Sequence, residues 1–283
     1  MDKAPLLRPA LIDALFALPD IEGRFSDVQN QFLHAQGQRR PLVLIASAPR
    51  SAGTFLRAAA IEAVDGQLMR FVQAEGGRDA TLYLPTLLAY FEGLYATDIA
   101  VTHVHMPASD ANRHMMDALD LRPIIMLRSI PDMLSSLWTL LGEGAPLGFS
   151  FLKPSDFAHK SETDMADLMI DVMGPWYVQY FAGWKRYAED VAGRVCVLDF
   201  ADFSGDPAGA LEQALAHARV PKSYAACQNA IAAIWNRRQA FRCNPGRPPH
   251  PFGPERLARL AHLLSLYPEL AAWREQLLPH SAV

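Results

Sequence analysis

The chain has 283 residues, of which 51% are hydrophobic, and a formal net charge of −4 at pH 7. This length and apolar content suffice for one substantial core, which favours a single domain over residues 1–283. The net negative charge argues against non-specific nucleic-acid binding, which needs a broad basic surface, and no apolar run approaches the ~18 residues of a membrane span.

The amino-terminal part and the cysteines bear on the cellular compartment. Residues 1–38 predict a helical extension that covers either the sheet or a partner subunit. The second alternative implies a homo-oligomer. The apolar run Leu11 to Leu18 is short and carries Asp13, unlike a signal peptide. The three cysteines form no disulfide or metal pattern. These features fit a reducing cytoplasm, and we expect a cytoplasmic protein.

Residues 41–64 predict a strand, a short loop and a helix. Leu42 to Ile45 is an apolar run typical of a strand covered on both faces. Apolar residues recur at helical spacing from Thr54 onward, and Thr54 can cap this helix. The start of such a helix presents unpaired N–H groups at the positive end of its dipole, so we expect an anion site whose usual occupant is phosphate.

The loop differs from the nucleotide-triphosphatase loop, which has a lysine before its Ser or Thr. The chain has five lysines and none lies near this loop, where Arg50 supplies the positive charge. Ala52 stands where such loops often use glycine, and a residue with a Cβ is not expected to adopt positive φ freely. The full stretch is Pro49-Arg50-Ser51-Ala52-Gly53-Thr54-Phe55-Leu56.

Residues 98–105 predict another strand, which ends in two histidines. Strand alternation puts His103 and His105 on the same face. A histidine at the carboxyl end of a strand, beside a phosphate loop, is well placed to take a proton from an acceptor hydroxyl. The alternative is a pair of histidines bonded to backbone or water. Zinc binding is disfavoured because no third ligand lies nearby in the sequence.

Residues 121–128 predict a second buried strand that ends in Arg128. A helix with an apolar face follows, and Ser136 lies eight residues beyond Arg128. A guanidinium at the strand end and a hydroxyl on the next helix can grip one phosphate. Arg128 alone could equally pair with a surface carboxylate.

The remaining segments complete an α/β pattern. Residues 141–163 are irregular and form either a lid or an ordinary surface loop. Residues 165–190 predict a helix rich in aromatic residues, which line either the core or the acceptor pocket. Pro175 either kinks this helix or starts a new one. A strand over 194–200 and an amphipathic helix over 254–270 follow. We therefore expect a single α/β domain with a central, mostly parallel sheet of about five strands flanked by helices.

These segments resemble, in chain order, the elements of the sulfotransferases that use 3′-phosphoadenosine 5′-phosphosulfate (PAPS). The matching stretches are residues 49–56, 103–107, 128–136, 200–207 and 241–247. The resemblance implies a fold like that of P-loop-containing nucleotide hydrolases, PAPS as cosubstrate, 3′-phosphoadenosine 5′-phosphate (PAP) as product, and no metal. It implies that the nucleotide contacts come from Arg50, Ser51, Ala52, Gly53, Thr54, Phe55, Arg128, Ser136, Arg242, Gly246 and Arg247.

The resemblance also assigns roles in catalysis. It implies that Arg50 stabilises the leaving group and that His105 is the general base, with Glu75 as the alternative base. The acceptor is a small molecule or glycan with a hydroxyl or amine, which the sequence does not identify. Two alternatives remain: a P-loop kinase or other nucleotide-dependent transferase, and a nucleotide-binding protein without catalysis.

Overall fold

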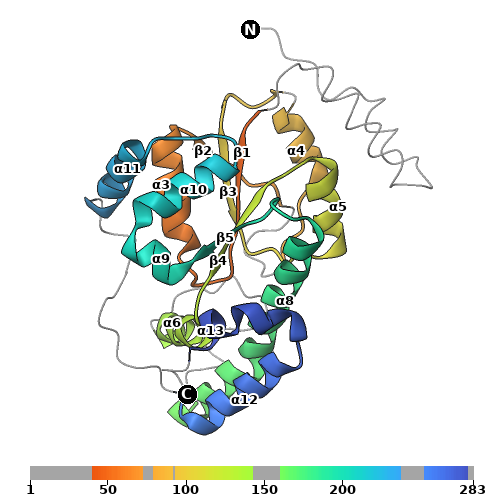
Figure 1. The fold of residues 1–283 in the computed structure, drawn as a ribbon, viewed down its shortest axis with the longest axis vertical. Coiled ribbons are helices and arrows are strands. Elements are labelled where there is room, and N and C mark those ends of the chain that lie inside the picture. Colours follow the sequence, from red (N-terminus) through yellow and green to blue (C-terminus); the bar gives the residue numbers. More distant parts are fainter. Residues whose placement is uncertain (1–39, 73–78, 92, 143–159, 237–251, 280–283) are drawn as a thin grey trace, which may run out of the picture.

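The computed structural model describes residues 40–72, 79–91, 93–142, 160–236 and 252–279. Within these ranges lies a five-stranded sheet of order β2-β3-β1-β4-β5, in which every neighbouring pair is parallel (Figure 1). The predicted α/β class with a parallel sheet of five strands is confirmed. The strands are β1 Leu42–Ala46, β2 Gln67–Leu68, β3 Ala100–Val104, β4 Pro123–Leu127 and β5 Cys196–Asp199.

Helices cover both faces of this sheet. In Figure 1, α3, α10 and α11 lie on one side of the strands and α4 and α5 on the other, whereas α6 and α12 lie beyond the carboxyl ends of the strands. The bounds are α3 Gly53–Val64, α4 Leu84–Phe91, α5 Asp110–Ala118, α6 Ile130–Gly142, α10 Pro207–His217, α11 Tyr224–Asn236 and α12 Pro254–Ser265. The short helices α9 Phe200–Gly205, η3 Pro268–Trp273 and α13 Arg274–Leu277 complete these layers.

The central strands are apolar throughout because each face meets a different core. Every residue of β1 is buried, and so is every residue of β4. Leu42, Leu44 and Ala46 belong to one hydrophobic cluster, while Val43 and Ile45 belong to the cluster under α3. This is the burial that continuous apolar runs predict for parallel strands.

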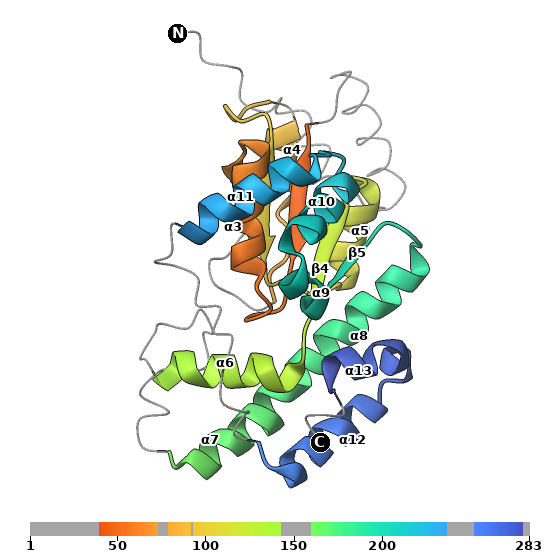
Figure 2. The same ribbon diagram turned by 60° about the vertical axis from the view of Figure 1, so that its left-hand side comes forward.

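A long helical segment starts beyond the carboxyl ends of the strands and runs up beside the sheet (Figure 2). It consists of α7 Glu162–Leu168, a π-helical turn over Met169–Met173, and α8 Gly174–Asp190. Ser161 and Asp164 form a reciprocal capping box at its start. Pro175 lies in the first turn of α8, so it starts a new helix, one of the two outcomes expected from the sequence.

Some boundaries differ from the sequence expectations. The first sheet-covering helix begins at Gly53 and takes Ala52 as its N-cap without a side-chain cap bond, so the expectation that Thr54 caps it is wrong. By contrast, Ser109 caps α5 through its side chain, since its hydroxyl accepts from the Asn112 amide. Helix α11 packs against α3 and was not among the helices expected from the sequence.

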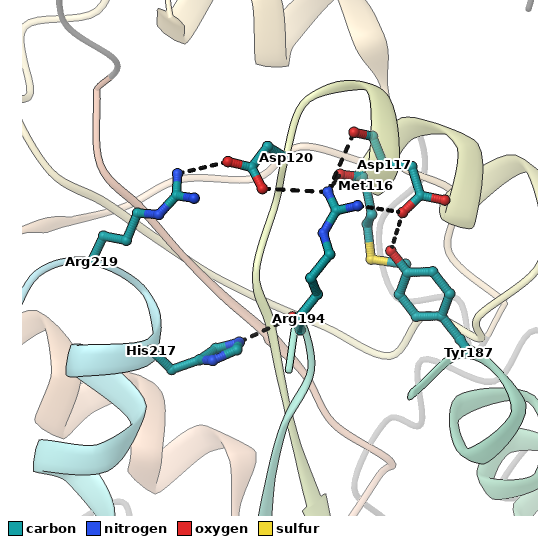
Figure 3. A network of polar contacts seen from close by, with 7 residues as sticks. All are labelled: Met116, Asp117, Asp120, Tyr187, Arg194, His217 and Arg219. Carbon is teal, nitrogen blue, oxygen red and sulfur yellow. Dashed lines mark hydrogen bonds and ion pairs between the residues drawn. The ribbon is translucent and has the colours of Figure 1, made fainter. Parts of the chain in front are cut away.

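A polar network fastens the sheet at the amino ends of β4 and β5, away from the carboxyl ends of the strands. Arg194 donates to Asp117 Oδ1 at 3.1 Å and to Asp120 Oδ1 at 3.3 Å (Figure 3). The Tyr187 hydroxyl of α8 donates to the same Asp117 oxygen at 2.8 Å, and Arg219 pairs with Asp120 at 2.7 Å. One guanidinium thus joins α5, α8 and the segments that lead into two strands.

We expect Arg194→Ala to lower the free energy of unfolding by about 2 kcal/mol, because it removes several charge-assisted hydrogen bonds at once. Glu189→Ala is the matched control, since its exposed ion pair with Lys185 is worth about 0.5 kcal/mol or less. Urea denaturation of both variants measures the difference. Equal losses in the two variants would contradict a structural role for the network.

Candidate nucleotide site

The loop after β1 holds two residues in the left-handed backbone region. Arg50 has φ 67° and Ala52 has φ 70°, so the expectation that Ala52 avoids positive φ is wrong. The loop is fixed by its own hydrogen bonds: the Ser51 hydroxyl donates to the Ala48 carbonyl at 2.7 Å, and the Ala52 carbonyl accepts from the amides of Phe55 and Leu56. Backbone strain held in this way by the surrounding structure is concentrated at functional sites.

Glycine is required at position 53 because the start of α3 lies directly on two polar side chains. A Cβ atom there would lie 1.9 Å from Ser47 Oγ and 2.4 Å from His103 Nε2. No real Cβ makes contacts this short. The backbone at the start of α3 therefore packs directly against His103 at the end of β3.

Ser47 connects the two histidines at the end of β3. Its hydroxyl lies 2.7 Å from His103 Nε2, and its carbonyl lies 2.7 Å from His105 Nδ1. Because a carbonyl only accepts, His105 Nδ1 carries the proton, and Nε2 is the nitrogen that can take one from a substrate. The two imidazole rings meet edge to face, with 5.1 Å between their centroids. Nothing in the local sequence marks Ser47, since a serine after a strand is common.

Both histidines are neutral at pH 7. Burial, reinforced by the charges of His105 and Arg57, lowers the pKa of His103 well below 6.5. Burial also lowers the pKa of His105, although its hydrogen bond to Ser47 opposes the shift. An unprotonated His105 has the protonation state that a general base requires.

The same pKa shifts predict acid sensitivity. Below about pH 6.5 the unfolded chain protonates His103 and the folded chain does not, so the unfolded state binds more protons and stability falls as the pH falls. We expect His103 to contribute about 1.4 kcal/mol per pH unit in this window. Urea denaturation between about pH 5 and pH 7 should show a shallower slope in His103→Asn. An unchanged slope would contradict a neutral, buried His103.

Arg50, Arg128 and Ser136 lie together at the carboxyl ends of the adjacent strands β1 and β4. Arg50 Nε donates to Ser136 Oγ at 2.8 Å, and Arg128 Nη1 donates to the Arg50 carbonyl at 2.7 Å. The Arg128 guanidinium also covers the Phe200 ring, 4.1 Å from its centroid. Residues that are 86 and 78 positions apart in the chain thus form one cluster of two guanidiniums and a hydroxyl.

Three aromatic side chains of α8 hold the backbone around this cluster. The Tyr177 hydroxyl donates to the Pro49 carbonyl at 3.0 Å, and the Tyr180 hydroxyl donates to the Ala46 carbonyl at 2.8 Å. Trp184 Nε1 donates to the Met106 carbonyl at 3.1 Å, one residue after His105. All three are buried, so these aromatic residues of α8 belong to the core. They also anchor the segments that carry Arg50 and His105.

Phe55 lies in the core below the loop. Its ring meets the edges of Phe203 and Trp235, with centroid distances of 5.8 and 5.7 Å. Phe55 is 4% exposed, whereas Trp235 is 44% exposed at the end of α11. Trp235 therefore presents the accessible aromatic surface next to Phe55, although no local sequence pattern marks it as a site residue.

Several sequence-predicted residues fall outside the described part of the chain: Glu75, Arg242, Gly246, Arg247, residues 1–38 and most of residues 141–163. Among the described residues, no group of three or more His, Cys, Asp or Glu side chains could hold a metal ion. In the same ranges, no helix combines the length and apolar character needed to cross a membrane.

Comparison with known proteins identifies the fold. No protein-family model and no curated protein matches the sequence. The structure is similar to mouse sulfotransferase SULT7A1 in its complex with PAP, with a TM-score of 0.57 and 12% identity over 86% of this chain and 89% of that one. A sulfotransferase from Alicyclobacillus acidocaldarius matches with a TM-score of 0.44 and 17% identity over 84% of this chain and 95% of that one. The parallel sheet with helices on both faces is thus a P-loop-like α/β architecture. More specifically, the chain has the sulfotransferase fold.

Proposed function

We propose that the protein is a sulfotransferase that moves a sulfuryl group from PAPS to a hydroxyl or amine of an acceptor. The observation that carries this proposal is the cluster of Arg50, Arg128 and Ser136 at the ends of β1 and β4. These strands flank the point where the strand order reverses, and α/β sheets bind ligands in the crevice there. The PAP complex of the structurally similar mouse enzyme supports the same donor.

The start of α3 would hold the 5′-phosphate. The Phe55 and Leu56 amides already bond to Ala52, and the amides of Gly53 and Thr54 donate to no other described residue. They lie at the N-terminus of a 12-residue helix, where backbone N–H groups and the helix dipole both favour an anion. Arg50 adds a full positive charge beside them.

Arg128 and Ser136 would hold the 3′-phosphate. Arg128 donates one bond to the Arg50 carbonyl, and a planar guanidinium matches the geometry of a phosphate. A 3′-phosphate distinguishes PAPS from ATP, so this pair would supply the donor specificity. Phe55 and the more exposed Trp235 would border the adenine.

The transfer step assigns a role to each group. The acceptor oxygen or nitrogen attacks sulfur, and His105 Nε2 takes the acceptor's proton as the new bond forms. The sulfur–oxygen bond to the 5′-phosphate breaks in line, and its electron pair leaves on PAP. Arg50 and the helix amides stabilise the charge on that leaving oxygen. Glu75 remains the alternative base.

Label transfer tests the proposal. The protein is incubated with ³⁵S-labelled PAPS and pools of metabolites or glycans, with γ-³²P-labelled ATP in parallel. We expect ³⁵S, and no ³²P, in an organic product with the wild type, and far less ³⁵S with Arg128→Gln. Transfer of ³²P would establish the kinase alternative. PAP binding without any label transfer would favour a nucleotide-binding protein.

A further inference from the structure

A second group of basic side chains lies on the β2–β3 side of the loop, away from Arg128. Arg57 follows Gly53 by four residues on α3, so the two share a helix face. That face lies against His103, because a Cβ on Gly53 would be 2.4 Å from His103 Nε2. Helical side chains tilt toward the helix N-terminus, which directs the Arg57 side chain toward the loop.

Arg70 reaches the same place from the edge of the sheet. Leu68 pairs with Val101, and the Met69 amide continues the ladder to the Val101 carbonyl at 3.0 Å. Arg70 comes two residues after Leu68, as His103 comes two residues after Val101, so the two are level at the carboxyl ends of β2 and β3.

The directions of the pKa shifts agree with this arrangement. Burial lowers the pKa of Arg57, and the positive charge of Arg70 lowers it further. Burial, the charge of His105 and the charge of Arg57 together lower the pKa of His103. Arg57 is half-buried and makes no hydrogen bond or ion pair with another described residue. A chain of net charge −4 thus gathers positive charge beside His103, whose ring contacts that of the candidate base His105.

We propose that Arg57 and Arg70, beside His103, form a subsite for an anionic group on the acceptor, a carboxylate or a sulfate or phosphate ester. This inference rests on the proposed function. The two phosphates of the donor have their own partners at β1 and β4, whereas these arginines lie beside β3, which leads to His105. An acceptor that reaches His105 Nε2 must pass this end of the sheet.

The chemistry favours oxyanions. Guanidinium groups bind carboxylates, sulfates and phosphates through paired N–H···O bonds, and two of them together favour an anion more than either alone. The acceptor class is therefore an anionic alcohol, phenol or amine, and a neutral analogue is bound less well.

Sulfate titration of the PAP-saturated protein tests the subsite. Sodium sulfate is added against sodium chloride of equal ionic strength, and the ring signals of His103 are followed by NMR. We expect saturable shifts and a rise in the His103 pKa. Sulfate affinity should fall about tenfold or more in Arg57→Gln and in Arg70→Gln. Arg186→Gln on α8, which removes an exposed arginine elsewhere, should leave it unchanged.

Nucleotide affinities show whether the two arginines bind the acceptor or the donor. PAPS and PAP affinities that are both unchanged in Arg57→Gln support an acceptor subsite. Loss of PAPS affinity with PAP affinity retained would assign the arginines to the donor's sulfuryl group and overturn the inference. Sulfate binding that is absent in the wild type, or retained in both variants, would also overturn it. Failure of PAP to bind would instead overturn the proposed function, and the acceptor assignment with it.

Discussion

The His105→Gln protein is expected to transfer sulfuryl groups about 10²–10⁴-fold more slowly than the wild type. Glutamine can still donate an amide hydrogen toward the Ser47 carbonyl, but it cannot take a proton from the acceptor. The affinity for PAP should stay within about twofold, because the phosphates contact other residues. Single-turnover transfer from labelled PAPS measures the chemical step.

The pH profile of kcat adds a second readout. Since burial lowers the pKa of His105 below 6.5, activity should be retained above the lowered pKa and fall only as the pH drops through it. His262→Gln is the matched control, an exposed histidine on α12. A rate within about tenfold of the wild type would remove His105 from the mechanism, and a large loss in Glu75→Gln would then identify the base.

Gly53→Ala should disable the donor site. The new methyl group would lie 1.9 Å from Ser47 Oγ and 2.4 Å from His103 Nε2, so the helix start or the loop has to move. Overpacking of this kind costs about 1–3 kcal/mol. If the loop absorbs the displacement, PAP affinity falls by roughly 5–150-fold. Calorimetry with PAP and thermal unfolding measure the two effects.

Gly205→Ala provides the matched control for this substitution. A Cβ at Gly205 in α9 would have no atom within 4 Å, and its backbone is helical. We expect its stability and PAP affinity to match the wild type. Equal behaviour of the two variants would show that the close approach of α3 to β3 does not matter for binding.

The sequence predicted the scaffold because local signals and burial agreed. The apolar runs over β1, β3, β4 and β5 are typical of strands in a parallel sheet that helices cover on both faces, and the ends of β1, β3 and β4 marked candidate residues. Arg50, Arg128 and Ser136 were predicted separately, and the parallel topology brings them into hydrogen-bonding distance. Their use in nucleotide binding stays a prediction.

Features that depend on tertiary contact could not be predicted. The roles of Ser47 and Tyr177 arise from carbonyls and side chains far away in the chain, and neither residue stands out locally. The expectation for Ala52 was wrong because the loop's own hydrogen bonds outweigh the preference of a residue with a Cβ. Arg57 lay inside an ordinary amphipathic pattern, so nothing in the sequence connected it with His103.

In the proposed complex, two arginines at neighbouring strand ends grip opposite ends of one doubly phosphorylated adenosine. Calorimetry with PAP and ATP on the wild type and on Arg128→Gln tests this arrangement. We predict that the wild type binds PAP at least about tenfold more tightly than ATP, a difference of about 1.4 kcal/mol, and that Arg128→Gln loses this preference. ATP binding as tight as PAP binding in the wild type would contradict this arrangement.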